Sequence, residues 1–137
     1  MTHKFRTRDE DKSVYGNFLK KAGEFLHAAA ASFEKNEYNA ASSNAVHVVI
    51  SASDALCVYF LGRRSAGDSH EEAIALFNSL SLPTDEKEEN ARRISRVLGI
   101  KNMAGYESRL VFRQEAENAI RDADRFLLFA RKSLPII

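Results

Sequence analysis

The sequence predicts an all-α protein, an up-and-down helical bundle of about five helices. Apolar residues recur at three- and four-residue steps in several long segments, which is the period of helices packed along one face. No segment alternates apolar and polar residues over a useful length, so the signals of β-strands are missing. The two prolines, Pro83 and Pro135, both stand outside the segments that carry the helical period.

The length of 137 residues fits one domain, which we assign to residues 1–137. Residues 1–11 are highly charged and lack the apolar stretch of a signal peptide, so we expect a flexible N-terminal segment in a cytoplasmic protein. Apolar residues make up 45% and charged residues 28% of the chain, as in ordinary globular proteins. The net charge of only +1 argues against a protein dedicated to binding duplex DNA.

Two long helices are expected in the first half of the chain. The first covers residues 15–33, where Tyr, Phe, Leu and Ala residues form one apolar stripe, and the segment EKNEYN at residues 34–39 breaks it. The second runs from about Ala40 to Leu61 and stops at Gly62. It is the most apolar helix, which predicts a central position. Its polar residues make a membrane span improbable.

Three shorter or more polar helices are expected after it. The sequence SHEE at residues 69–72 has the form of a capping box that opens a third helix. Thr84, directly after Pro83, is the expected N-cap of a fourth helix that Gly99 interrupts or weakens near its end. A fifth helix is expected over about residues 110–133, with an alanine-rich face.

A polar stripe on the second helix is the first candidate site. His47, Ser51 and Asp54 are spaced i, i+4 and i+7 and share one narrow sector, with Ser43 nearby. A carboxylate in an apolar setting is costly unless it is paired or hydrogen-bonded. We therefore expect a basic residue, a second copy of the chain, a ligand or water to meet this stripe. A plain solvent-facing edge satisfied by local backbone bonds is the alternative.

Most familiar chemistries have no motif in this sequence. The six glycines form no phosphate-binding loop, and the four histidines and one cysteine have no metal-ligand spacing, so neither a cofactor nor a metal is expected. No serine stands in a nucleophile turn. The single cysteine, Cys57, lies in an apolar run and is expected to be a small buried side chain.

Residues 44–77 (NAVHVVISASDALCVYFLGRRSAGDSHEEAIALF) resemble the second helix, loop and third helix of HEPN domains. The shared features are a second helix rich in small residues, the SDAL segment ending in LG, the GDSH turn and an apolar third helix. Residues 98–106 (LGIKNMAGY) are similar to the motif that closes the fourth helix in this family. The alanine-rich last helix also fits, so the resemblance covers nearly the whole chain.

The resemblance implies a helical bundle that commonly dimerises and often works on RNA or beside a nucleotidyltransferase. Catalytically active members cut RNA with an arginine followed four to six residues later by a histidine. In this sequence Lys101 stands for the arginine and Tyr106 for the histidine. A tyrosine with a pKa near 10 is a poor proton acceptor at neutral pH, and lysine lacks the planar fork of arginine. Catalysis by this motif is therefore not expected.

These observations give one preferred hypothesis and two alternatives. We expect a non-catalytic HEPN-like homodimer that binds RNA, a nucleotide or a partner protein in a polar groove. The expected setting is a toxin–antitoxin or nucleotidyltransferase-associated system. The alternatives are a metal-independent endoribonuclease that uses His70 or His47, and a purely structural dimerising bundle. The expected groove consists of Lys101, Asn102, Tyr106, His47, Ser51 and Asp54, with Arg64 and His70 at its rim.

Overall fold

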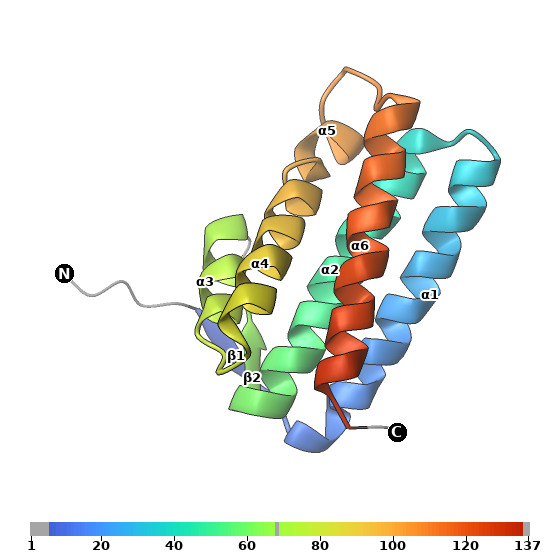
Figure 1. Ribbon diagram of the computed structural model, residues 1–137. Helices are drawn as coiled ribbons and strands as arrows, with labels where there is room; N and C mark the ends of the chain where they lie inside the picture. The colour runs from blue at the N-terminus through green and yellow to red at the C-terminus, as the bar shows by residue number, and fades with distance from the viewer. Residues whose placement is uncertain (1–5, 68, 136–137) are drawn as a thin grey trace.

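The computed structural model describes residues 6–67 and 69–135 as a helical bundle (Figure 1). Three long helices lie side by side: α1 (Tyr15–Glu34), α2 (Tyr38–Leu61) and α6 (Arg113–Ser133). Helix α4 (Thr84–Leu98) packs against α6 and α2, and α3 (His70–Asn78) packs against α4 and α2. The predicted all-α bundle is confirmed, and the five helices of nine or more residues match the expected number in this part of the chain.

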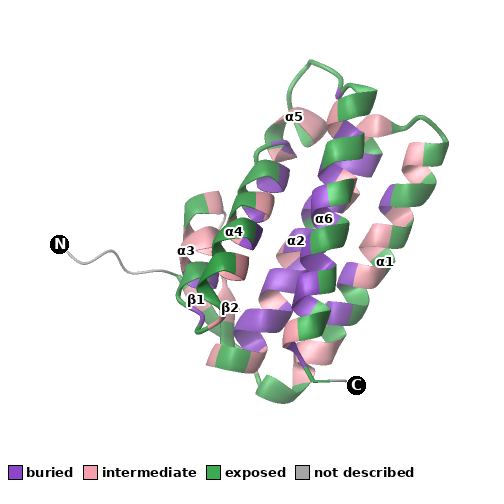
Figure 2. Cartoon of the chain, in the orientation of Figure 1, coloured by how far each residue is buried: buried purple, intermediate pink, exposed green. Residues whose placement is uncertain are grey.

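Helix α2 is the core of the bundle, as predicted from its composition. It contacts α1, α3, α4, α5 and α6, and the buried positions in Figure 2 follow the inner faces of these helices. By length and composition alone α2 is apolar enough to cross a membrane. However, 61% of its most apolar 18-residue window is buried inside the bundle, so its central position accounts for its apolarity.

A small two-stranded sheet was not predicted. Strand β1 (Thr7–Asp9) pairs antiparallel with β2 (Arg63–Ser65), which begins directly after Gly62 ends α2 with a φ of 71°. An ion pair of 3.0 Å between Glu10 and Arg64 continues the pairing. The expected flexible segment 1–11 is therefore wrong for residues 7–9, while residues 1–5 lie outside the described residues. Strands of three residues are too short to show an alternating pattern.

Several helix boundaries differ from the expected ones. Ser69 caps α3 as predicted, since its Oγ accepts from the backbone N of Glu71 at 3.1 Å. Thr84 is not an N-cap: α4 already includes it, and the cap residue is Pro83, which has no side-chain acceptor. Residues 101–105 form a separate short helix, α5 (Lys101–Gly105), after α4 ends at Leu98. Helix α6 begins at Arg113, three residues later than expected.

Two contacts hold α3 and α4 against α6. The rings of Phe77 in α3 and Phe126 in α6 are both fully buried and meet edge to face, with centroids 5.6 Å apart. Arg96 in α4 donates two hydrogen bonds of 3.0 Å to the buried carboxylate of Asp122 in α6. The first contact is apolar and the second is a bidentate ion pair, and together they fix the helices that form the cavity described next.

Candidate functional site

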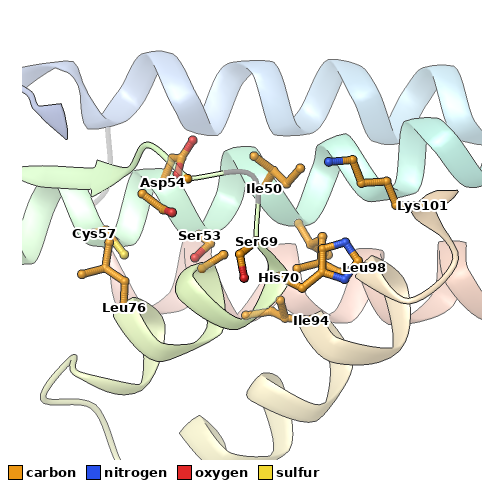
Figure 3. Close-up of a pocket in the computed structure, with 14 residues that line it drawn as sticks. Ile50, Ser53, Asp54, Cys57, Ser69, His70, Leu76, Ile94, Leu98 and Lys101 are labelled. Atoms are coloured by element: carbon orange, nitrogen blue, oxygen red, sulfur yellow. The ribbon is translucent and has the colours of Figure 1, made fainter. Parts of the chain in front are cut away.

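A partly open cavity of about 190 Å³ lies where α2, α3 and α4 meet (Figure 3). The segment from β2 to the start of α3 borders it, and α5 supplies Lys101 at one end. The residues that line the cavity come from α2, β2, α3, α4 and α5, and from Gly67 and Ser69 between β2 and α3. The apolar lining consists of Val49, Ile50, Ala73, Leu76, Ile94 and Leu98, and the polar lining of Ser53, Asp54, Cys57, Ser65, Ser69, His70 and Lys101.

The polar groups lie at two ends of the cavity rather than in one cluster. Figure 3 shows Asp54, Ser53 and Cys57 at one end, and Lys101 and His70 at the other. Ile50 lies between Asp54 and Lys101 on the α2 side. The cavity therefore has an acidic end and a basic end, and Ile50 and Ser69 lie between them. We call it the dipolar cavity below.

Asp54 is the acidic group of this cavity. Its carboxylate makes no hydrogen bond or ion pair with any residue in the described part of the chain, and burial raises its pKa from 3.8 to about 7. The positive charge of Arg64 opposes this shift but does not cancel it, since Arg64 is already paired with Glu10. At neutral pH the protonated and ionised forms of Asp54 are therefore both populated.

The basic end combines a lysine with an imidazole. His70 is the first residue of α3, and both its burial and the positive charge of Lys101 lower its pKa below 6.5. Its ring is therefore neutral at pH 7, so Lys101 is the cation of this end. In Figure 3 the side chain of Lys101 extends from α5 along α2 toward Ile50. An anionic group of a ligand would meet Lys101 there.

Cys57 is expected to be unreactive although it lines the cavity. It is 2% exposed, and burial together with the charge of Asp54 raises its pKa to about 12. The thiolate is the reactive form, so almost none of it is present at pH 8. Native protein treated with a chromogenic disulfide at pH 8 should release less than about a tenth of the signal of the urea-unfolded chain, for which a thiol pKa near 8.5 applies. Equal labelling rates of both states would contradict this.

The predicted groove residues do not share one site. Asp54, Lys101 and the rim residue His70 line the dipolar cavity. His47 is exposed and stacks on Phe25 of α1 with ring centroids 4.9 Å apart, and neither it nor Ser51 is part of the cavity lining. Three further groove and rim residues also lie outside the lining: Asn102, Tyr106, which is 82% exposed, and Arg64, which pairs with Glu10.

The geometry of α2 explains this split. At about 100° per residue, the stripe of His47, Ser51 and Asp54 and the sector that lines the cavity are centred roughly 90° apart on the helix. Asp54 lies where the two sectors meet, so it alone belongs to both. Helix α1 covers the side of α2 that carries His47, as the stacking on Phe25 shows. An ion pair between Lys101 and Asp54, which would have joined the two sides of the expected groove, is not formed among the described residues.

Sequence reasoning missed Ser53, Ser65 and the capping Ser69 as cavity residues. Ser53 is four residues from Cys57, and this spacing on an apolar helix was the available signal. Ser65 is brought to the cavity by the unpredicted strand β2, and its Oγ is buried with no hydrogen-bond partner in residues 6–67 and 69–135. Buried hydroxyls are normally satisfied, so this one is available to a ligand or water.

The model of the HEPN domain family matches residues 15–133, which span α1 to the end of α6. This chain belongs to the HEPN domain family. The match confirms the resemblance that the SDAL, GDSH and LGIKNMAGY segments indicated. A search of curated proteins finds no match to the chain. As a HEPN domain, the protein carries its dipolar cavity between the second, third and fourth helices, and the motif of residues 101–106 forms α5 beside it.

Proposed function

We propose that this HEPN domain is a non-catalytic binding module that takes a nucleotide in the dipolar cavity. The observation that supports it best is the convergence of Asp54, His70 and Lys101 from three different helices on one apolar cavity. A concave apolar site with a few convergent polar groups is the usual form of a small-molecule site. The unpaired hydroxyl of Ser65 adds a fourth polar group for a ligand.

The size of the cavity favours one ring system. Its volume of about 190 Å³ lies below the roughly 300–1,000 Å³ of sites that enclose a drug-sized ligand. In this proposal a single base lies between Ile50 of α2 and Leu98 of α4, and its phosphate lies nearer to Lys101. An RNA strand would reach the cavity only with a terminal or flipped-out base.

The same geometry argues against catalysis by the family motif. Tyr106, which stands at the position of the catalytic histidine in active relatives, is 82% exposed and lies outside the cavity lining. Lys101 alone lines the cavity, so the two motif positions do not act on one ligand within this chain. Lys101 without the proton acceptor of the family motif can hold a phosphate, but the motif alone does not cleave at it.

Lys101→Ala tests the proposal directly. Removal of the cation at the phosphate end should weaken the binding of nucleoside monophosphates at least about tenfold, because a charge-assisted contact contributes about 1.5–3 kcal/mol. The measurement is isothermal titration calorimetry with the four ribonucleoside monophosphates. Lys35→Ala, at the exposed C-terminal end of α1, is the matched control and should bind like the wild type. Absence of binding of every monophosphate to the wild type would refute the proposed function.

A ribonuclease is the second candidate, favoured by the neutral imidazole of His70 beside Lys101. Purified protein incubated with a mixed RNA ladder without divalent metal tests it. Cleavage that His70→Ala abolishes would replace the binding proposal with catalysis at the same cavity. Intact RNA, or cleavage that survives both His70→Ala and His47→Ala, would end the nuclease idea.

We also propose a cytoplasmic homodimer, in keeping with the expectation from the sequence. Three large side chains support a second copy of the chain, since Tyr106, Leu110 and Phe112 are all exposed between α5 and the start of α6. Clusters of exposed apolar side chains often mark contact surfaces. A nucleotidyltransferase-type protein, as in toxin–antitoxin pairs, is the further partner that we propose for the homodimer.

A further inference from the structure

The carboxylate of Asp54, at the acidic end of the dipolar cavity, limits which nucleotide base the proposed site can accept. Asp54 lies at the end of the cavity opposite Lys101, and Ile50, about one helical turn before Asp54 on α2, lies between them. A ligand whose phosphate meets Lys101 therefore presents the far edge of its base to Asp54. The hydrogen-bonding groups on that edge decide whether the carboxylate is satisfied.

An ionised carboxylate in this position accepts hydrogen bonds but donates none. Its two oxygens are spaced to receive two parallel N–H groups. Guanine offers two adjacent donors on its Watson–Crick edge, N1–H and N2–H. Adenine, cytosine and uracil each place an acceptor beside their donor on that edge, so each would turn a lone pair toward the carboxylate.

We propose that the dipolar cavity selects a guanine nucleotide, with the N1–H and N2–H groups of the base donating to Asp54 and the phosphate meeting Lys101. This inference rests on the proposed function, because it names the nucleotide that the same cavity takes. Ser53, beside Asp54, and Ser65 have hydroxyls that can serve the remaining acceptor of the base, O6. The free chain leaves Asp54 unpaired, and a guanine would satisfy it.

The charges around Asp54 set the pH dependence of this selectivity. Arg64 from β2 and Lys21 from α1 favour the ionised form, and Glu10 before η1 (Lys12–Val14) opposes it. From the cavity itself, Asp54 faces the protonated thiol of Cys57 on α2, the neutral His70 of α3 and the distant Lys101 of α5; α4 contributes only Ile94 and Leu98. The burial that raises the pKa of Asp54 to about 7 leaves it mostly protonated at pH 6.

Guanine binding should therefore release a proton and weaken on acidification. With a pKa of about 7 in the free protein, the Kd for GMP rises about tenfold between pH 8 and pH 6. A protonated carboxyl offers one donor and one acceptor, and this pair also matches the Watson–Crick edge of adenine. The ratio of the Kd for AMP to the Kd for GMP should therefore fall between pH 8 and pH 6. The ratio of the two Kd values cancels the titration of the phosphate, whose second pKa is about 6.

The experiment is calorimetric titration of the full chain with GMP, IMP and AMP at pH 8 and pH 6. At pH 8 we expect GMP to bind at least about tenfold more tightly than AMP, with IMP between them because it lacks the N2 amino group. Asp54→Asn should remove the pH dependence and most of the preference for GMP, since one amide donor and one amide acceptor pair with N6–H and N1 of adenine as well as with O6 and N1–H of guanine. Glu34→Gln, which alters an exposed carboxylate at the end of α1 outside the cavity, should leave the GMP to AMP ratio unchanged.

Two outcomes separate this inference from the proposed function. Equal Kd values for GMP and AMP, both weakened by Lys101→Ala, would overturn guanine selection and leave nucleotide binding intact. No binding of any mononucleotide would overturn both. A parallel titration uses short RNA oligonucleotides that end in guanosine or adenosine. It shows whether the bound base belongs to a free mononucleotide or to the end of an RNA strand. Guanosine-terminated RNA that binds more tightly than GMP supports guanine selection and assigns it to an RNA end, and preference for the adenosine-terminated RNA contradicts it.

Discussion

Replacement of Asp54 by asparagine should raise the free energy of unfolding by roughly 2–4 kcal/mol at pH 8. Burial raises the pKa of Asp54 from 3.8 to about 7, and each unit corresponds to about 1.4 kcal/mol of preference for the protonated form. At pH 8 the folded protein must keep this group ionised and unpaired. Asparagine has a similar shape and no charge, so the variant lacks most of that penalty.

The gain should depend on pH in a defined direction. The folded state binds the Asp54 proton more tightly than the unfolded state, so the wild type loses stability as pH rises from about 4 to 7 and no further above that. The advantage of Asp54→Asn should therefore be near zero at pH 4 and full above pH 7. Urea unfolding monitored by circular dichroism at pH 4.5, 6 and 8 measures this window.

Asp122→Asn is the matched control, because it makes the same chemical change at another buried carboxylate. Asp122 is held by two hydrogen bonds of 3.0 Å from Arg96, so loss of its charge should destabilise the protein by about 1–3 kcal/mol. Opposite signs for the two variants at pH 8 are expected. A destabilising effect of Asp54→Asn at pH 8 would show that a partner within the protein compensates the carboxylate.

Phe77→Ala should destabilise the protein by about 3–5 kcal/mol, the usual cost of removing a fully buried phenylalanine. Phe77 is 0% exposed and packs edge to face on Phe126, with Phe129 as its second aromatic neighbour. It lies near the end of α3, a helix of nine residues that begins with His70 at the cavity. Chemical denaturation at pH 7 measures the loss.

A second effect of Phe77→Ala follows from the position of α3. Loosened packing of α3 on α6 should displace Ser69 and His70, so the proposed nucleotide binding should weaken even at temperatures where the variant remains folded. Leu128→Ala is the control, because Leu128 is 57% exposed on α6 and its loss should change stability by less than about 1 kcal/mol. Equal stabilities of the two variants would contradict the role of Phe77 as the anchor of α3.

Most of the fold followed from helical periodicity because the helices are long and each has a clear apolar face. The expected first and second helices begin and end within about two residues of α1 and α2. Errors occurred where local chemistry is ambiguous. Pro83 and Thr84 are both residue types that are common at the start of a helix, and Pro83 is the N-cap of α4. Strand β2 depends on pairing with residues 56 positions away, which no local pattern reveals.

The site was predicted only in part, because its position depends on which neighbour covers each side of α2. The spacing of His47, Ser51 and Asp54 correctly places them along one line of the helix, but α1 packs on that line at His47. Asp54 was identified because a carboxylate in an apolar helix is costly wherever it lies. Ser65 reaches the cavity through tertiary pairing alone, and its sequence context is that of an ordinary loop serine.

The pairing of Thr7–Asp9 with Arg63–Ser65 determines when the cavity is built during folding. The chain between the two strands contains α1 and α2, so we expect the strands to pair at low entropic cost only once those helices have packed together. Ser65, which β2 places in the cavity lining, should therefore be ordered late in folding. The amide protons of β1 and β2 should in turn exchange with solvent before those of α1, α2 and α6, so the candidate site can open while the three long helices stay assembled.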